Sequence, residues 1–344
     1  MYASIRKLIN LEDEFKKLLK IKKQAESHDL YKIDRAPGSG ISGDSIAHQQ
    51  GVCRCDGDGE LIITGSIKNS SKSSKDHPYF YVIKNWIGSK SIGTEGLDYV
   101  TFIIDSSDHR RYTHPGGIQI AENVLAIGIE DYIDSEVSVH TDRSVVKFYN
   151  IGNEENIFEI TNWGFSRSGK NKIASAIGFT KTIYGQWILA VRGNNEIELY
   201  AFAIEAPIAE QKFKSCGTIT FDSVNKLKNF QGMNLFWEKN PTTNKDKLFL
   251  IGGPDGSSTD DKLFLYEIIL HYNENLVDGI DKIVFKTEVH LYSSNNHARF
   301  KYGVGTFVNE MNHFEVYSIT MHVDNGKIGC NIWNTGTTPK EVSE

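Results

Sequence analysis

The chain has 344 residues, of which 39% are hydrophobic and 11% aromatic, and this composition is enough to bury a large core. Its formal net charge of −6 excludes the clustered positive surface that nucleic acid requires, so we expect no nucleic-acid partner. No stretch approaches the roughly eighteen apolar residues of a membrane-spanning helix, and we predict no transmembrane segment.

The first predicted element is an amphipathic helix from about Leu11 to Ser27. Its acidic residues come early and its basic residues late, which suits the helix dipole. We expect its apolar stripe to pack on the domain that follows, with docking of the basic segment Lys16–Lys23 on an anionic membrane as an alternative. No apolar leader is visible, so we expect a cytoplasmic protein; a secreted protein with its leader removed would look the same. The apolar residues recur at helical spacing as Leu8, Leu11, Phe15, Leu18 and Leu19.

After Pro37 the pattern becomes that of β-strands, and it contains a repeat. Five glycines recur at intervals of 54 to 71 residues, each followed by an apolar residue and a strand-like run. A period of this size is typical of radial repetition, so the sequence predicts an all-β fold, a five-bladed β-propeller. The five glycines are Gly51, Gly117, Gly178, Gly232 and Gly303.

Each of the first four repeats offers four strand candidates, including one over Ile157–Phe165 in the second, whereas the fifth offers three. An incomplete last blade would expose an unpaired strand edge. We therefore predict that Leu30–Asp34 pairs as the outermost strand of the last blade and closes the ring. The predicted division is an N-terminal helix (1–29), a single propeller (30–336) and a polar tail (337–344).

Polar residues near the repeat glycines are the candidate ligand-binding residues, because the first strand of each blade lines the centre of a propeller. His48 and His114 occupy matching positions in adjacent repeats and are the sharpest pair. They could serve as acid–base or metal-binding groups, or each could hydrogen-bond a nearby carbonyl group and order its strand. The candidate set is His48, Gln50, His114, Gln119, Thr180, Gln231, Asn234 and Tyr302.

Other groups carry weaker signals. The later repeats offer no third ligand beside the two histidines, so we predict no metal site, and no cofactor is identified. Glu130 and Asp131 follow a predicted strand, and we expect them to be solvated loop charges, with a carboxylate supplied to a site or to calcium as the alternative. We interpret the four cysteines as small buried or half-buried thiols without a disulfide framework.

The repeated strings, among them His48-Gln-Gln-Gly-Val52, Ala176–Thr180 and Phe230–Leu235, resemble those of bacterial β-propeller-like proteins whose function is uncharacterised. The likeness spans about residues 46 to 320. It implies a propeller and carries no activity or catalytic residue.

Two main functional hypotheses remain. The first is a non-enzymatic binding module for a protein, peptide or glycan, motivated by a rigid ring with many loops and by Trp86, Trp163 and Trp333, which could stack on a ligand. Structural packing of these tryptophans between blades is the favoured alternative. The second is a hydrolase or lyase, with or without metal assistance, whose site lies at the mouth of the central channel around His48 and His114. The sequence favours the first because no complete catalytic set is visible.

Overall fold

The protein is described by a computed structural model that is almost entirely β-structure. One short helix, α1 (Leu11–Lys17), continues into a single 3₁₀ turn (Leu18–Lys20). The described residues are 10–20, 26–31, 47–55, 60–67, 77–83, 99–104, 112–132, 140–152, 156–169, 172–202, 212–221, 229–239, 246–254, 260–274, 276–292, 298–309, 311–320 and 327–336.

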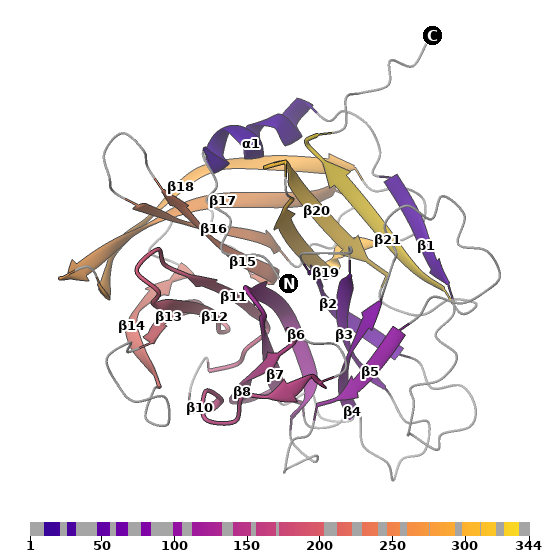
Figure 1. Cartoon of the computed structure of the whole chain (residues 1–344), viewed down its shortest axis with the longest axis horizontal. Helices are drawn as coiled ribbons and strands as arrows, with labels where there is room; N and C mark the ends of the chain where they lie inside the picture. Colours follow the sequence, from indigo (N-terminus) through magenta and orange to yellow (C-terminus); the bar gives the residue numbers. More distant parts are fainter. Residues whose placement is uncertain are drawn as a thin grey trace.

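Five antiparallel sheets stand around a common centre, each forming one blade, so the predicted five-bladed β-propeller is confirmed (Figure 1). In each blade the strand with the repeat glycine lies innermost. The first three blades run outward through β2 (Ala47–Arg54), β3 (Leu61–Ile67), β4 (His77–Ile83) and β5 (Tyr99–Ile103); β6 (Tyr112–Ala121), β7 (Val124–Tyr132), β8 (His140–Asn150) and β10 (Phe165–Ser168); and β11 (Ala176–Lys181), β12 (Trp187–Arg192), β13 (Glu196–Phe202) and β14 (Phe213–Thr220).

The fourth and fifth blades carry the longest strands and the closure of the ring. The fifth blade is completed by the N-terminal strand β1, which follows β21 at its outer edge. Their strands are β15 (Phe230–Lys239), β16 (Asp246–Pro254), β17 (Asp260–Asn273) and β18 (Leu276–Tyr292), then β19 (Arg299–Val308), β20 (Phe314–Ile319), β21 (Lys327–Asn334) and β1 (Glu26–Tyr31).

The predicted closure by an N-terminal strand is confirmed, with a shifted start. β1 pairs antiparallel with β21, and Leu30 lies opposite Ile328. The strand already begins at Glu26, so the predicted helix to Ser27 is too long; residues 32–34 lie outside the described part.

One strand prediction in the second blade is wrong. The expected continuous strand Ile157–Phe165 is replaced by the two-residue strand β9 (Phe158–Glu159) and by β10, both of which pair with β8. The chain turns between them, and Trp163 leaves the sheet to pack against Phe202, with ring centroids 4.8 Å apart. Packing of this indole therefore overrides the local strand propensity.

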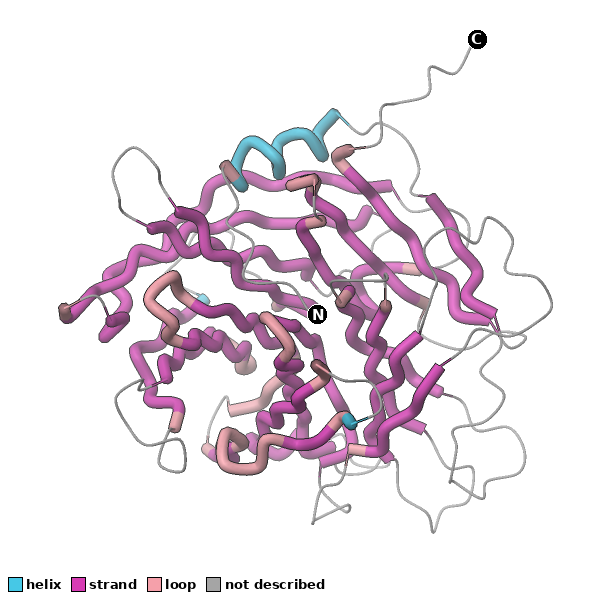
Figure 2. The backbone as a smooth tube through the Cα atoms, in the orientation of Figure 1, coloured by secondary structure: helices cyan, strands magenta, loops and turns pink. Residues whose placement is uncertain are grey.

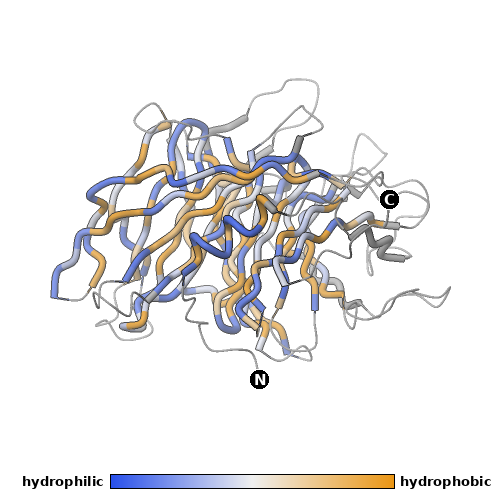
Figure 3. The backbone as a smooth tube through the Cα atoms, turned by 90° about the horizontal axis from the view of Figure 1, so that it is seen from above, coloured by the Kyte–Doolittle hydropathy of each residue, from blue (hydrophilic) through white to orange (hydrophobic). Residues whose placement is uncertain are grey.

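The core is divided among the five blade interfaces. Each of five buried apolar clusters combines side chains of two neighbouring blades, including a cluster from β2, β3 and β4 with β20 and β21 where the ring closes. Seen from the side, apolar segments run through the body of the ring (Figure 3). Hydrophobic burial between blades therefore holds the sheets in a closed circle.

Helix α1 covers the outer junction of the fourth and fifth blades (Figure 2). Leu11, Phe15 and Leu18 are fully buried, and the Phe15 ring lies 6.1 Å from that of Phe314. The backbone N–H of Leu11 donates to the Glu238 carboxylate at 2.6 Å. Leu11, Phe15 and Leu18 of the apolar stripe thus pack on the propeller, as expected, whereas Leu19 is 52% exposed.

The inner strands meet at the centre of the ring. A Cβ atom placed on Gly117 of β6 would lie 2.8 Å from the backbone oxygen of Gln231, although these residues belong to the second and fourth blades. Glycine is required for this approach because any side chain would collide with backbone. The axis is therefore packed at the glycine layer, and a functional surface must lie on one of the two faces of the ring.

Candidate functional site

We call the end of the ring where the five inner strands begin the front face, and the end where they finish the back face. On the front face His114 of β6 lies opposite Glu130 of β7. Its Nδ1 is 3.3 Å from the Glu130 carboxylate. The Glu130 side chain is 4% exposed and the His114 side chain 24%, so solvent reaches the imidazole and not the carboxylate.

A β-bulge creates this pair. The pairing of β6 with β7 shifts by one residue between Pro115 and Ile118, across the glycine pair of the repeat. Because successive side chains of a strand alternate between faces, this shift decides which side chains of the two strands meet. The structure thus corrects the expectation that Glu130 is a solvated loop charge, since it is a buried group inside the sheet.

Gln50 of the first blade reaches the other nitrogen of His114. Its Nε2 lies within hydrogen-bond distance of His114 Nε2. When Nε2 carries no proton, it can accept a hydrogen bond from the amide N–H of Gln50. The Glu130 carboxylate, the His114 imidazole and the Gln50 amide therefore lie in a row, joined by an ion-pair contact on one side of the ring and a hydrogen-bond contact on the other.

A buried cation stands on the same face in the third blade. Arg192 closes β12 opposite the start of β11, is 7% exposed, and donates from Nη1 to Ser175 Oγ. The backbone oxygen of Ser175 accepts a hydrogen bond from Gly117 N at 2.9 Å. The hydrogen bond from Gly117 holds the Arg192–Ser175 pair against β6, and Gly117 follows His114 by three residues in that strand.

The remaining front-face candidates come from the other blades. His48 lies in β2 opposite Ser66. Gln231 and Tyr302 are half-buried at the starts of β15 and β19, and a Cβ on Gly303 would lie 3.1 Å from the backbone oxygen of Gln50. The structure therefore brings His48, Gln50, His114, Gln231 and Tyr302 to one face.

Gln119 and Asn234 hold blades together. Gln119 Oε1 accepts from Phe179 N at 2.7 Å and from Leu235 N at 2.8 Å. Asn234 Oδ1 accepts from the backbone and the hydroxyl of Thr306 at 3.0 and 2.9 Å. Thr180, at the matching position of the third blade, is buried and makes no side-chain hydrogen bond with the described residues. The amides of Gln119 and Asn234 satisfy inner-strand backbone groups that have no ladder partner.

Two of the three tryptophans considered as stacking surfaces lie in the described part of the chain, and both pack against other side chains. Trp333 is 1% exposed, and Trp163 lies in an aromatic cluster 5.6 Å from Trp187. Trp86 lies outside the described residues. Packing between blades or strands, the alternative that the sequence favoured for these tryptophans, is thus what the structure shows for Trp333 and for the partly buried Trp163.

The cysteines are free thiols, as expected. Burial raises the pKa of Cys330 to about 12, which keeps its thiol protonated and unreactive. Among the residues that the structure describes, no group of three or more metal-binding side chains occurs. The helix found in this part of the chain is not long and apolar enough to cross a membrane.

No protein-family model matches the chain, and no curated protein matches it in sequence. Similar solved structures include a glycosyl hydrolase from Bacteroides ovatus, at 9% identity over 100% of this chain and 96% of that one, with a TM-score of 0.46. A levansucrase from B. megaterium is 12% identical over 95% and 93% of the two chains, with a TM-score of 0.44.

A sialidase from Trypanosoma rangeli, solved with sialic acid, is 8% identical with a TM-score of 0.40; the match covers 90% of this chain and 59% of the sialidase. At these identities the likeness concerns the fold, and the function has to be argued from the residues of this chain.

Proposed function

We propose that this protein is a hydrolase or lyase whose acid–base site lies on the front face of the propeller. The observation that carries the proposal is the chain of Glu130, His114 and Gln50. It supports an enzyme rather than the binding module that the sequence favoured, since Trp333 is buried and Trp163 is partly buried against other aromatic rings.

His114 is the proposed general base. The Glu130 carboxylate, 3.3 Å from Nδ1, would favour a proton on that nitrogen and leave Nε2 to accept a proton from a water molecule or from a substrate. Gln50 occupies that nitrogen in the free protein and would give way to the substrate. The protonated imidazole then returns the proton to the leaving group as a general acid.

Arg192 is the proposed electrostatic partner. A buried guanidinium stabilises negative charge on a substrate more strongly than an exposed one, because the local dielectric constant is low. We therefore expect substrates that carry a carboxylate or develop an oxyanion next to the bond that breaks. Glycans containing uronic acids and carboxylic esters both meet this requirement. The roles of His48, Gln231 and Tyr302 are proposed to be substrate contacts around this centre.

The test is turnover of a panel of chromogenic esters, glycosides and uronic-acid polysaccharides. For any substrate that is turned over, we expect His114→Ala to lower kcat by on the order of 10²–10⁴-fold and Glu130→Gln by about 10–100-fold. The matched control is His290→Ala, which removes an exposed histidine that lies 3.7 Å from Glu288 on an outer strand. Activity unchanged in His114→Ala, with folding shown by circular dichroism, would refute the proposal.

A further inference from the structure

A second polar cluster lies on the back face, between the third and fourth blades, outside the site described above. Its centre is Asp246, the first residue of β16. Both oxygens of its carboxylate are buried and have no hydrogen-bond partner in the described structure. A buried carboxylate without a partner is costly, so such a group in a folded protein calls for a cation.

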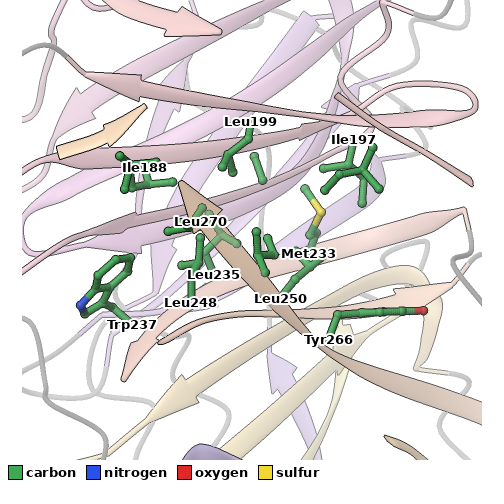
Figure 4. Close-up of a cluster of buried hydrophobic side chains, with 14 of the residues drawn as sticks. Ile188, Ile197, Leu199, Met233, Leu235, Trp237, Leu248, Leu250, Tyr266 and Leu270 are labelled. Atoms are coloured by element: carbon green, nitrogen blue, oxygen red, sulfur yellow. The ribbon is translucent and has the colours of Figure 1, made fainter. Parts of the chain in front are cut away.

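Trp237 contributes a second unpartnered group. It is 3% exposed, and its indole Nε1 is buried without an acceptor. Trp237 pairs with Leu248, and Lys239 pairs with Asp246, so Trp237 and Asp246 are diagonal neighbours on one face of the sheet. In Figure 4 the indole nitrogen lies on the side of the ring away from Leu235 and Leu248. The polar edge of Trp237 thus faces away from the apolar core.

Two tyrosines complete the cluster at the surface. Tyr184 and Tyr272 are 44% and 38% exposed, among the most exposed large hydrophobic side chains described. The pKa of Tyr272 is raised to about 12 by burial first, then by the charge of Asp246 and by Tyr184. Tyr272 therefore lies within electrostatic reach of the Asp246 carboxylate on one side and of Tyr184 on the other.

The hairpin that carries Tyr184 is fixed to the fourth blade. The side chain of Gln186 accepts from Val277 N at 2.7 Å and donates to Val277 O at 3.3 Å. Val277 is the strand partner of Tyr272. This two-bond clamp keeps the two tyrosines on opposite sides of one junction between blades.

We propose that this back-face cluster binds an organic ammonium cation. Aromatic faces around a carboxylate attract such a cation by combining charge pairing with cation–π attraction. A calcium ion would require six to eight oxygen ligands, and one carboxylate does not supply them. The same ammonium chemistry is offered by a quaternary amine, by a primary amine and by a lysine side chain of a peptide.

The test titrates the full chain with tetramethylammonium, n-butylammonium and an N-acetyl-lysine amide. The reporter is the ¹⁵N–¹H resonance of the Trp237 indole, assigned among the five tryptophans with Trp237→Phe. We expect a saturable shift with at least one probe. Preference for tetramethylammonium identifies a quaternary ligand, preference for the lysine amide a peptide, and preference for n-butylammonium a free amine.

Single substitutions measure how much each side chain of the cluster contributes to ammonium binding. Asp246→Asn should weaken binding at least tenfold, and Tyr184→Ala and Tyr272→Ala about two- to fivefold each. Asp281→Asn is the matched control, since this aspartate is 55% exposed beside His271 on the same blade, and it should leave binding unchanged.

Two results would overturn the proposal. One is the absence of any shift with all three probes. The other is an internal ion pair with Lys239, the strand partner of Asp246. In that case Lys239→Met and Asp246→Asn would lower the stability of the protein equally, and the double variant would be no less stable than either single variant. Ammonium binding would then be the same in Asp246→Asn as in the wild type.

Discussion

Replacing Gln119 by leucine should strongly destabilise the ring, because this side chain spans three blades at the axis. Its amide donates to Leu235 O at 2.8 Å, and its oxygen accepts from the backbone of Phe179 and Leu235. β11 and β15 are the innermost strands of their blades, so groups that point to the axis have no ladder partner. Leucine leaves two N–H groups and one carbonyl group buried and unsatisfied.

The magnitude follows from those three groups. Each buried polar group that loses its partner costs about 1–3 kcal/mol, so the loss should be at least about 3 kcal/mol. A loss of this size is a large share of the roughly 5–15 kcal/mol that stabilises a typical native protein. Urea unfolding followed by tryptophan fluorescence measures it as a fall in the transition midpoint at unchanged slope.

The control is Thr180→Val at the matching position of the third blade. Thr180 is also buried, and its hydroxyl makes no hydrogen bond with the described residues, so this variant should lose less than about 1 kcal/mol. If Gln119→Leu and Thr180→Val lost the same amount, the bridge across the axis would be refuted.

Two further predictions concern helix α1. Phe15→Ala should cost about 3–5 kcal/mol because the ring is fully buried, whereas Leu19→Ala, at a 52% exposed residue, should cost almost nothing; urea unfolding of both variants checks this. Burial raises the pKa of Glu238, even though Leu11 N donates to its carboxylate. The folded protein therefore holds this proton more tightly than the unfolded chain, and the stability so gained is lost as pH rises from the ordinary value of about 4.3 through the raised pKa. Stability measured against pH should show this loss in the wild type and not in Glu238→Gln; parallel curves would contradict it.

The period of the glycines predicted the number of blades because radial repetition needs the same close approach in every inner strand. The missing strand of the last blade predicted ring closure, because an open sheet edge would leave backbone hydrogen-bonding groups unpaired. The start of β1 at Glu26 could not be predicted, because the sequence around Ser27 suits either element and the pairing with β21 decides between them.

The candidate site was predictable in part. The position of His114 beside a repeat glycine placed it on the front face, but its partner Glu130 was missed. Counting residues back from the turn between β6 and β7 would place Glu130 opposite Pro115, and the bulge shifts it to His114. A glycine pair in an inner strand was the available signal for that bulge.

The roles of Gln119 and Asn234 depended on distant backbone. Both lie two residues after a repeat glycine, as a channel-lining residue would. Their partners Leu235 and Thr306 become neighbours only when the ring closes, so local sequence gives no indication of these hydrogen bonds.

The most direct test of the account is the tautomer of His114, because the proposed chemistry requires Nε2 to be the free base. Long-range ¹⁵N–¹H spectra of the protein at neutral pH, assigned with His114→Ala, report which nitrogen carries the proton. We predict that the ring carries its proton on Nδ1 rather than on Nε2 in the wild type, and that this preference is lost in Glu130→Gln. A ring protonated on Nε2 in the wild type would contradict it.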